Sequence, residues 1–205
     1  MHLIPTNEEV ITMLRQTGAL RDGHFEYPNG MHADEFLQVP VAFRYYQWAK
    51  ILSVGLSRRL RAETDIRAMI KELSIVSPTT AGLPIAYGVC EALRAHQVYW
   101  AETENDDPDR MSFRQFIEPE KGEKVLLVDD ILRSGKRLTT LRSLVESKGA
   151  QVVGLAVAVY QPNPTIANFD GLPLFYLAQM DATYYKDAES CELCKKGVPI
   201  QKIRA

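Results

Sequence analysis

Apolar and polar stretches alternate along the chain in a way that predicts strands and helices in turn. Apolar runs predict strands at Leu73–Val76, Gln97–Ala101, Lys124–Val128 and Gln151–Tyr160. Helical periodicity predicts helices between them, at Pro84–Arg94 and at Leu138–Ser147, the second closed by Gly149. Strands and helices in this rhythm form a parallel sheet covered by helices. The predicted fold class is therefore α/β, with ligands expected beyond the carboxyl ends of the strands.

The amino-terminal part shows a different pattern. Thr6 and Glu9 have the spacing of a capping box, which predicts a helix over Asn7–Gln16 that stops at Gly18. Residues 21–40 are rich in Gly, Pro, Asn and aromatic residues and predict turns with short strands. A long amphipathic helix is predicted over Val41–Arg61.

Composition sets limits on function. The chain has 205 residues, 46% hydrophobic and 24% charged, which favours one globular domain. With 24 Lys plus Arg against 26 Asp plus Glu, the net charge of −2 gives no reason to expect nucleic acid or membrane as a partner. The start lacks the pattern of a signal peptide, and three cysteines are too few for a disulfide framework, so a cytoplasmic location is expected.

The segment from Lys124 to Leu138 carries the strongest functional signal. Its apolar strand leads to two adjacent acids, Asp129 and Asp130, and then to a turn containing Gly135. Backbone N–H groups in such a turn, at the start of a helix, can hold a phosphate, while the acids face sugar hydroxyls or Mg²⁺. Lys136 and Arg137 would be unfavourable near the positive end of a helix unless an anion binds there, although a solvated basic face that tolerates this small cost remains an alternative. An ATPase interpretation lacks the required Gly-x-x-x-x-Gly-Lys-Ser/Thr loop.

Four segments together resemble the type I phosphoribosyltransferases, and among them the orotate phosphoribosyltransferases. The strand with its two acids and Ser134-Gly135 resembles the family's substrate loop, and Ser77–Gly82 resembles its pyrophosphate loop. Residues 17–33 look like the amino-terminal part of the orotate enzymes, and Cys191–Ile200 is similar to the end of one bacterial branch. The resemblance covers nearly the whole chain in the right order. It implies a central parallel sheet flanked by helices as one core (about 41–171), with a small hood from about 18–40 and 172–205.

The resemblance also implies a reaction: transfer of the ribosyl phosphate group of 5-phosphoribosyl 1-diphosphate (PRPP) to a nucleobase, with Mg²⁺ and release of pyrophosphate. Asp129 and Asp130 would be the catalytic pair that holds the ribose hydroxyls. The other PRPP-binding positions would be Ile131, Leu132, Arg133, Ser134, Gly135, Lys136 and Arg137. The pyrophosphate loop would be Ser77, Pro78, Thr79, Thr80, Ala81 and Gly82. Residues 102–114, with Arg110 and Arg114, would form a flexible loop that serves the partner's site in a homodimer.

Several positions depart from the family pattern. Arg133 and Lys136-Arg137 stand where small residues are usual, and Thr103-Glu104 replaces a basic pair in the flexible loop. Tyr160-Gln161 stands where orotate enzymes have an Asp-Arg pair, which removes a bidentate partner for the orotate carboxylate. Two hypotheses follow: an orotate phosphoribosyltransferase-like enzyme whose acceptor base the sequence does not name, or a relative that binds PRPP or a nucleoside monophosphate without turnover. Phe36 and Tyr160 are the weakly indicated candidates for the base pocket.

Two smaller features stay open. Cys191 and Cys194 form half of a metal site, but a closed zinc site needs four ligands, so a free, solvent-facing pair is the favoured interpretation, and a site shared across a dimer the alternative. His24 and His32 lie in the hood segment, where each could touch a base, though a turn-stabilising role is the more common one.

Overall fold

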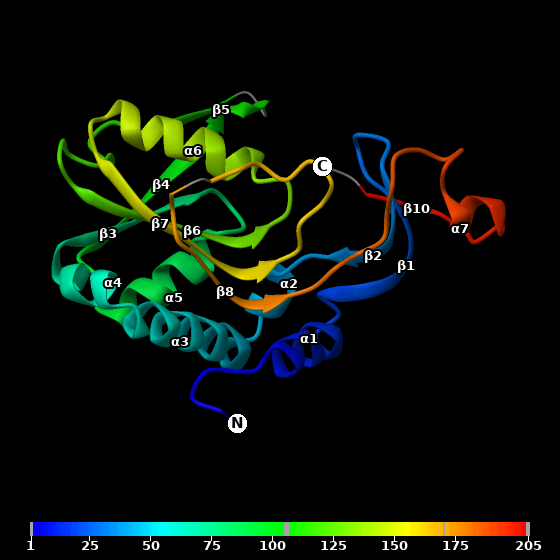
Figure 1. Cartoon of the computed structure of the whole chain (residues 1–205), viewed down its shortest axis with the longest axis horizontal. Helices are drawn as coiled ribbons and strands as arrows, with labels where there is room; N and C mark the ends of the chain where they lie inside the picture. The colour runs from blue at the N-terminus through cyan, green and yellow to red at the C-terminus, as the bar shows by residue number, and fades with distance from the viewer. Residues whose placement is uncertain (1, 105–106, 170, 204–205) are drawn as a thin grey trace.

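A six-stranded sheet forms the centre of the computed structural model, which describes residues 2–104, 107–169 and 171–203 (Figure 1). Its strands in chain order are β3 (Leu73–Pro78), β4 (Gln97–Glu104), β5 (Asp107–Phe113), β6 (Lys124–Leu132), β7 (Gln151–Tyr160) and β8 (Leu174–Gln179). They are arranged in the order β5-β4-β3-β6-β7-β8, and every neighbouring pair is parallel except β4 with β5. The expected central parallel sheet is confirmed.

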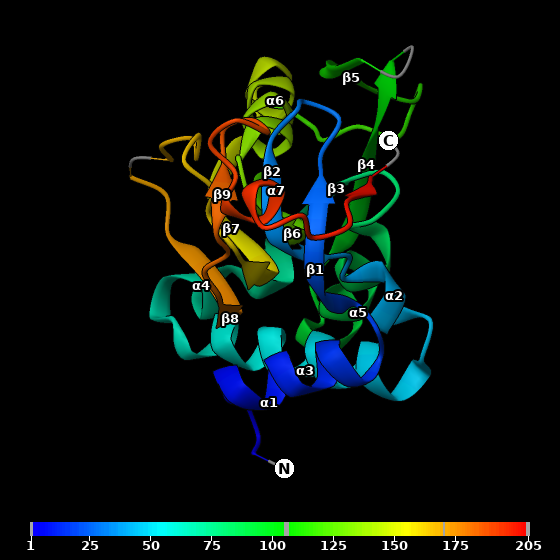
Figure 2. The same ribbon diagram turned by 90° about the vertical axis from the view of Figure 1, so that its right-hand side faces the viewer.

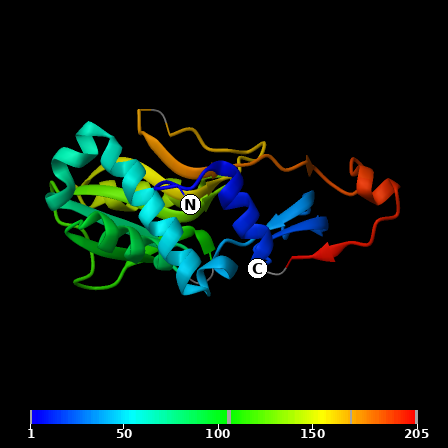
Figure 3. The same cartoon turned by 90° about the horizontal axis from the view of Figure 1, so that it is seen from below.

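Helices cover both faces of this sheet (Figures 1 and 3). One face carries α1 (Asn7–Gln16), α3 (Tyr46–Ala62) and α5 (Leu83–Leu93), and the other carries α6 (Lys136–Ser147). Short helices complete the chain: α2 (Pro40–Phe43), α4 (Thr64–Met69) and the 3-10 helix η1 (Ile70–Glu72). Because side chains alternate along a strand, Leu126 and Val128 pack on the first face and Val125 and Leu127 on the second, and all four are fully buried. The apolar run of β6 therefore reflects a strand buried on both faces.

A second, smaller sheet forms the hood. It consists of β1 (Leu20–Glu26), β2 (His32–Leu37), β9 (Tyr184–Tyr185) and β10 (Gln201–Lys202), in the order β10-β1-β2-β9. The short helix α7 (Glu192–Lys195) lies between β9 and β10. Figures 1 and 2 show the hood beside the carboxyl ends of β6 and β7, which is where a ligand of an α/β protein is expected. Strand β8 pairs with β7, so Leu174–Gln179 belongs to the large sheet and not to the hood in which the sequence analysis placed it.

The amino-terminal prediction is confirmed in detail. Helix α1 spans Asn7–Gln16, and Thr6 and Glu9 form the capping box in both directions: the Glu9 N–H donates to Thr6 Oγ1 at 3.2 Å, and the Thr6 N–H donates to Glu9 Oε2 at 2.9 Å. The single helix predicted over Val41–Arg61 is wrong, because the chain forms α2 and α3 with Arg44 and Tyr45 between them. Tyr45 has an extended backbone (φ −101°, ψ 112°), so the helical periodicity continues through a corner in the chain.

The described part of residues 102–114, the expected flexible loop, lies mostly in two strands. Residues Gln97–Glu104 and Asp107–Phe113 pair as an antiparallel hairpin, β4 and β5, at the edge of the large sheet. Residues 105 and 106, which the flexible-loop prediction includes, lie outside the described residues. The strand-forming residues Val98, Tyr99 and Trp100 begin this hairpin and explain its extended conformation. Among the described residues, no helix is both long and apolar enough to cross a bilayer.

Candidate active site

Asp129 and Asp130 lie near the carboxyl end of β6, at the centre of the large sheet. The strand does not end before them, as the sequence analysis expected, but continues to Leu132, paired with Tyr160 of β7. Their exposed fractions are only 3% and 4%. The Asp130 N–H donates to Asp129 Oδ1 at 2.9 Å, which fixes one carboxylate against the backbone. Two adjacent buried carboxyl groups near the end of a central strand are an unusual arrangement, and their burial costs free energy.

Burial is the main cause of their unusual acid–base behaviour. It raises the pKa of Asp129 well above its ordinary value, and the neighbouring charge of Asp130 raises it further. Burial also raises the pKa of Asp130. The Arg137 guanidinium opposes both shifts by stabilising the charged carboxylates. Strongly perturbed carboxyl groups beside a cation, at the edge of a sheet where ligands bind, are typical of a functional site.

The turn after β6 is shaped to present backbone N–H groups. Gly135 has φ +78°, a left-handed conformation that glycine adopts without strain, and it stands immediately before the first residue of α6. A Cβ atom at Gly135 would lie 2.9 Å from Phe169 Cε2 and 3.0 Å from Ala167 Cβ. The Ala167 N–H donates to the Ser134 carbonyl at 2.8 Å, so the loop after β7 supports the turn from outside. The N-terminus of α6, which is twelve residues long, borders the site, and the N-termini of helices are where phosphate groups commonly bind in proteins.

Arg137 connects this turn to the Ser77–Gly82 loop. Its guanidinium donates to the Thr79 carbonyl. Gly82 brings the same loop against β6, because a Cβ atom there would lie 2.6 Å from Asp129 Oδ1 and 3.2 Å from the Asp129 Cα. The two loops predicted to bind the two ends of the substrate thus meet at the paired acids.

Arg133 points in another direction, toward the hood. Its Nε donates to Gln161 Oε1 at 3.0 Å, and its NH2 group donates to the Leu37 carbonyl at 2.8 Å. The guanidinium carbon lies 5.7 Å from the ring centroid of Tyr27, close enough for a cation–π contact. The side chain that departs from the family pattern therefore carries its positive charge toward the hood.

A cavity of about 770 Å³ opens between the acids, the turn and the hood. Its lining includes every residue from Asp129 to Thr140, and from the hood and the loop after β7 it includes Tyr27, Asn29, Met31, Asn163, Thr165, Ala167 and Tyr184. The basic side chains and the twin acids thus border one hollow, as expected for a site that binds a sugar phosphate. Phe36 and Tyr160, the candidates for the base pocket, are not among its lining residues: Phe36 packs against Phe25 with ring centroids 5.5 Å apart, and Tyr160 packs against Tyr176 at 5.4 Å.

Two hood tyrosines that the sequence analysis did not single out, Tyr27 and Tyr184, line the cavity, and Gln161 stands directly after β7. Among the described residues, the hydroxyls of Tyr27 and Tyr184 and the amide nitrogen of Gln161 are buried without a hydrogen-bond partner. Burial raises the pKa of Tyr27, and it raises that of Tyr184 to about 12, so both hydroxyls keep their protons at neutral pH. No sequence pattern distinguishes these two tyrosines from the other aromatic residues, and only the folded chain shows that they line the cavity.

Arg110 and Arg114, the candidate cations of the flexible loop, are engaged with nearby acids. Arg110 Nε lies 3.7 Å from Asp107 Oδ2, and Arg114 Nε lies 2.7 Å from Glu102 Oε1. Both side chains are largely exposed, and neither lines the cavity. Exposed ion pairs of this kind contribute little to stability and can open at small cost.

Comparisons with known proteins agree with this geometry. Residues 48–168 match the model of the phosphoribosyl transferase domain. The chain is 30% identical over 192 residues to an orotate phosphoribosyltransferase of Thermotoga maritima, covering 93% of this chain and 94% of the relative. It is 28% identical over 196 residues to one of Caldanaerobacter subterraneus, covering 95% of both.

Solved structures show the same fold. The orotate phosphoribosyltransferase of Aeropyrum pernix superposes with a TM-score of 0.67 at 18% identity, covering 83% of this chain and 93% of that one. The enzyme of that name from Mycobacterium tuberculosis superposes with a TM-score of 0.59 at 18% identity, covering 84% and 95%. This chain therefore belongs to the phosphoribosyl transferase domain family and has the type I phosphoribosyltransferase fold.

Proposed function

We propose that this protein is a pentosyltransferase of the orotate phosphoribosyltransferase type, which transfers the 5-phosphoribosyl group of PRPP to a nucleobase and releases pyrophosphate. The observation that carries the proposal is the meeting of three parts at one cavity: the buried Asp129-Asp130 pair, the turn that begins α6, and the hood. In the reaction, the bond between C1 of the ribose and the pyrophosphate oxygen breaks while a ring nitrogen of the base bonds to the same carbon and releases its proton to water. The electron pair of the broken bond leaves with pyrophosphate.

The paired acids and the turn would hold the ribosyl phosphate. Asp129 and Asp130 would accept hydrogen bonds from the ribose hydroxyls, which are hydrogen-bond donors without charge. Backbone N–H groups of the turn, with the Ser134 hydroxyl, would hold the 5-phosphate, and Lys136 would add positive charge. Positive charge develops on the ribose ring as the leaving group departs, so fixed carboxylates beside the ring stabilise the transition state more than the ground state.

The pyrophosphate would lie against the Ser77–Gly82 loop. Arg137 supports this role, because its guanidinium is already bound to the Thr79 carbonyl and borders the cavity. Two buried carboxylates with raised pKa values also form an oxygen-rich donor set of the kind that a hard cation prefers. Mg²⁺ bound there with PRPP would neutralise charge on the leaving pyrophosphate.

The base is proposed to be orotate or a closely similar acidic pyrimidine. The relatives that cover nearly the whole chain are named orotate phosphoribosyltransferases. Tyr160-Gln161 lacks the arginine that would meet the carboxylate, but Arg133 brings a guanidinium to Gln161 from the neighbouring turn. The buried hydroxyls of Tyr27 and Tyr184 would donate to the ring carbonyls of such a base, which removes the cost of leaving them unpaired.

A homodimer is part of the proposal. By resemblance, residues 102–114 would close over the neighbouring subunit's site, where Arg110 or Arg114 would meet the pyrophosphate. The weak, exposed ion pairs of both arginines are compatible with such a change of partner.

The test is single-turnover release of pyrophosphate from PRPP and Mg²⁺, with orotate, uracil, adenine and hypoxanthine offered separately. We expect release with orotate and little with uracil, which lacks the carboxylate. Release only with a purine would overturn the assignment of the base, and binding of PRPP without release for any base would support the sensor alternative. That alternative is not favoured, because the relatives that match nearly the whole chain bear the names of enzymes.

A further inference from the structure

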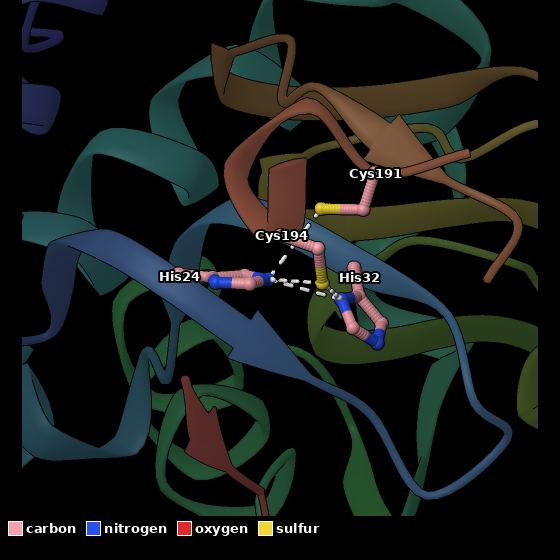
Figure 4. Close-up of side chains that lie close together, drawn as sticks. All are labelled: His24, His32, Cys191 and Cys194. Atoms are coloured by element: carbon pink, nitrogen blue, oxygen red, sulfur yellow. Dashed lines mark hydrogen bonds between the residues drawn. The ribbon is translucent and has the colours of Figure 1, made fainter. Parts of the chain in front are cut away.

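Four side chains from two segments that are far apart in the sequence meet in the hood (Figure 4). His24 lies on β1 and His32 on β2. Cys191 directly precedes α7, and Cys194 lies within it. His24 Nε2 lies 3.0 Å from His32 Nδ1, 3.4 Å from Cys191 Sγ and 3.6 Å from Cys194 Sγ, and His32 Nδ1 lies 3.4 Å from Cys194 Sγ. All four candidate ligand atoms lie within 4.8 Å of one another.

This arrangement corrects two interpretations made from the sequence. Cys191 is fully buried and Cys194 is partly buried, so the cysteines are not a freely solvent-facing pair, and two histidines of the same chain lie beside them. His24 and His32 are 2% and 4% exposed and are not among the lining residues of the substrate cavity, so they face the cysteines and not a base. All three cysteines of the chain are free thiols, Cys90 being the third.

Ordinary hydrogen bonds do not account for the environment of His24. Its Nδ1 lies 2.8 Å from the Val198 carbonyl, which can only accept, so Nδ1 carries the proton. Nε2 of the neutral ring then has one in-plane lone pair, yet three polar atoms surround it within 3.6 Å. One lone pair cannot accept a separate hydrogen bond from each of three neighbours. It can instead point at a position that lies between all four atoms.

Four of the six distances between the candidate ligand atoms lie near those of a tetrahedral zinc site. With Zn–N of about 2.0–2.1 Å and Zn–S of about 2.3 Å, tetrahedral angles place two nitrogens about 3.3 Å apart and a nitrogen and a sulfur about 3.5 Å apart. The nitrogen–sulfur distances of 3.4 to 3.6 Å agree with these values, and the nitrogen–nitrogen distance of 3.0 Å is slightly shorter, so a small outward movement of the two rings would admit the ion. The Cys-x-x-Cys spacing and the bond from His24 Nδ1 to a backbone carbonyl, which orients the ring, are also usual for zinc ligands.

We propose that His24, His32, Cys191 and Cys194 bind one structural Zn²⁺. Two thiolates and two imidazoles bind Zn²⁺ in preference to Mg²⁺, which favours oxygen ligands. Four protein ligands leave no open coordination position for catalysis. The ion fastens the carboxyl-terminal tail to the β1–β2 hairpin. The described part of this tail also contacts β1 through the short pairing of Phe25 with Gln201 and Glu26 with Lys202, and through the Val198 carbonyl, which lies 2.8 Å from His24 Nδ1.

The site also explains how the hood keeps its shape near the substrate cavity. His24 and His32 come from the two strands that flank the turn at residues 27–31, and Tyr27, Asn29 and Met31 of that turn line the cavity. Zinc at the base of the turn therefore positions one wall of the cavity without touching the substrate.

The direct test is the metal content of the full-length chain purified under reducing conditions from cells grown with added zinc. Elemental analysis is expected to find about one zinc per chain, and far less than one in Cys194→Ser and in His32→Ala. Cys90→Ser is the matched control, because Cys90 lies outside the cluster, and it should keep the wild-type content. A wild-type chain without zinc, or equal zinc in the Cys194→Ser chain, would overturn the proposal.

Cobalt gives a second measurement that does not depend on how well the variants fold. Co²⁺ added to the reduced, metal-depleted wild-type chain should produce the intense visible bands of a tetrahedral ion and the near-ultraviolet absorption of cobalt–thiolate bonds. Added Zn²⁺ should abolish both, and it should protect two of the three thiols from alkylation. Weak octahedral bands without thiolate absorption, or alkylation of all three thiols at one rate with zinc present, would refute the assignment. Neither readout depends on catalytic activity.

Discussion

Replacing Gly135 by alanine is a demanding test of the turn that begins α6. The residue has φ +78°, and an added Cβ would lie 2.9 Å from Phe169 Cε2 and 3.0 Å from Ala167 Cβ. A non-glycine residue in this conformation costs about 1–2 kcal/mol, and overpacking costs about a further 1–3 kcal/mol. We therefore expect Gly135→Ala to lower the free energy of unfolding by about 2–5 kcal/mol. At about 2–4 °C of Tm per kcal/mol for a chain of this size, the shift is readily measured by calorimetry.

Gly122→Ala is the matched control. Gly122 has φ +85°, but nothing lies within 4 Å of its added Cβ, so only the conformational cost of about 1–2 kcal/mol applies. The two variants should also differ in substrate binding. Displacing one N–H from a charged phosphate oxygen costs about 1.5–3 kcal/mol, so Gly135→Ala should weaken PRPP binding by about ten- to a hundredfold. Gly122→Ala should leave binding unchanged, and equal losses of Tm with equal PRPP affinity in both variants would refute the reasoning.

Four further predictions concern the acids, the hood and the first helix. Asp129→Asn should raise the Tm of the ligand-free protein while abolishing turnover, since it removes a buried charge; a lowered Tm in calorimetry would argue against this. Burial raises the pKa values of Asp129 and Asp130, and their charged forms act in catalysis, so kcat/KM should fall with decreasing pH at a pH above the pKa of an ordinary aspartate. A fall at the ordinary aspartate pKa would contradict this. Arg133→Ala should raise KM for orotate at least tenfold with little change in KM for PRPP, and the reverse pattern in steady-state kinetics would assign Arg133 to the phosphate. Thr6→Ala should lower the free energy of unfolding by about 1 kcal/mol in urea titrations through loss of the capping box, and no change would mean that water replaces the cap.

The pH dependence of stability follows from the same buried pair. An acid with a raised pKa in the folded state binds its proton more tightly there than in the unfolded state, so folding becomes less favourable as pH rises from the unfolded pKa through the folded one. The stabilisation is fully present only below this window. Asp129→Asn should therefore flatten the fall in stability across it.

Local sequence patterns predicted the helices and strands whose structure depends mainly on residues close together in the sequence. The capping box of α1 depends on contacts three residues apart, and β6 and β7 are apolar because the sheet is buried on both faces. The acids of the site were found by the same means, because an acid pair directly after an apolar run stands out in the sequence. Periodicity failed at Arg44 and Tyr45, because a corner that keeps its apolar side facing inward does not interrupt the pattern.

Long-range contacts explain the rest. No local signal shows that Arg133 reaches Leu37, 96 residues away, or that Tyr27 and Tyr184 face the cavity while Phe36 and Tyr160 do not. The same holds for the pairing of two histidines with two cysteines more than 160 residues distant. A half metal site in the sequence was visible, but its completion depended on where the carboxyl-terminal tail folds.

The central claim is that Asp129, Asp130 and the turn after them bind PRPP. The most direct measurement is calorimetric titration of the wild-type chain and of the Asp129→Asn, Asp130→Asn double variant with PRPP in the presence of Mg²⁺. We predict saturable binding by the wild-type chain and at least a tenfold loss of affinity in a double variant that remains folded. Equal affinity in both chains, or no binding to the wild type at millimolar PRPP, would contradict the account.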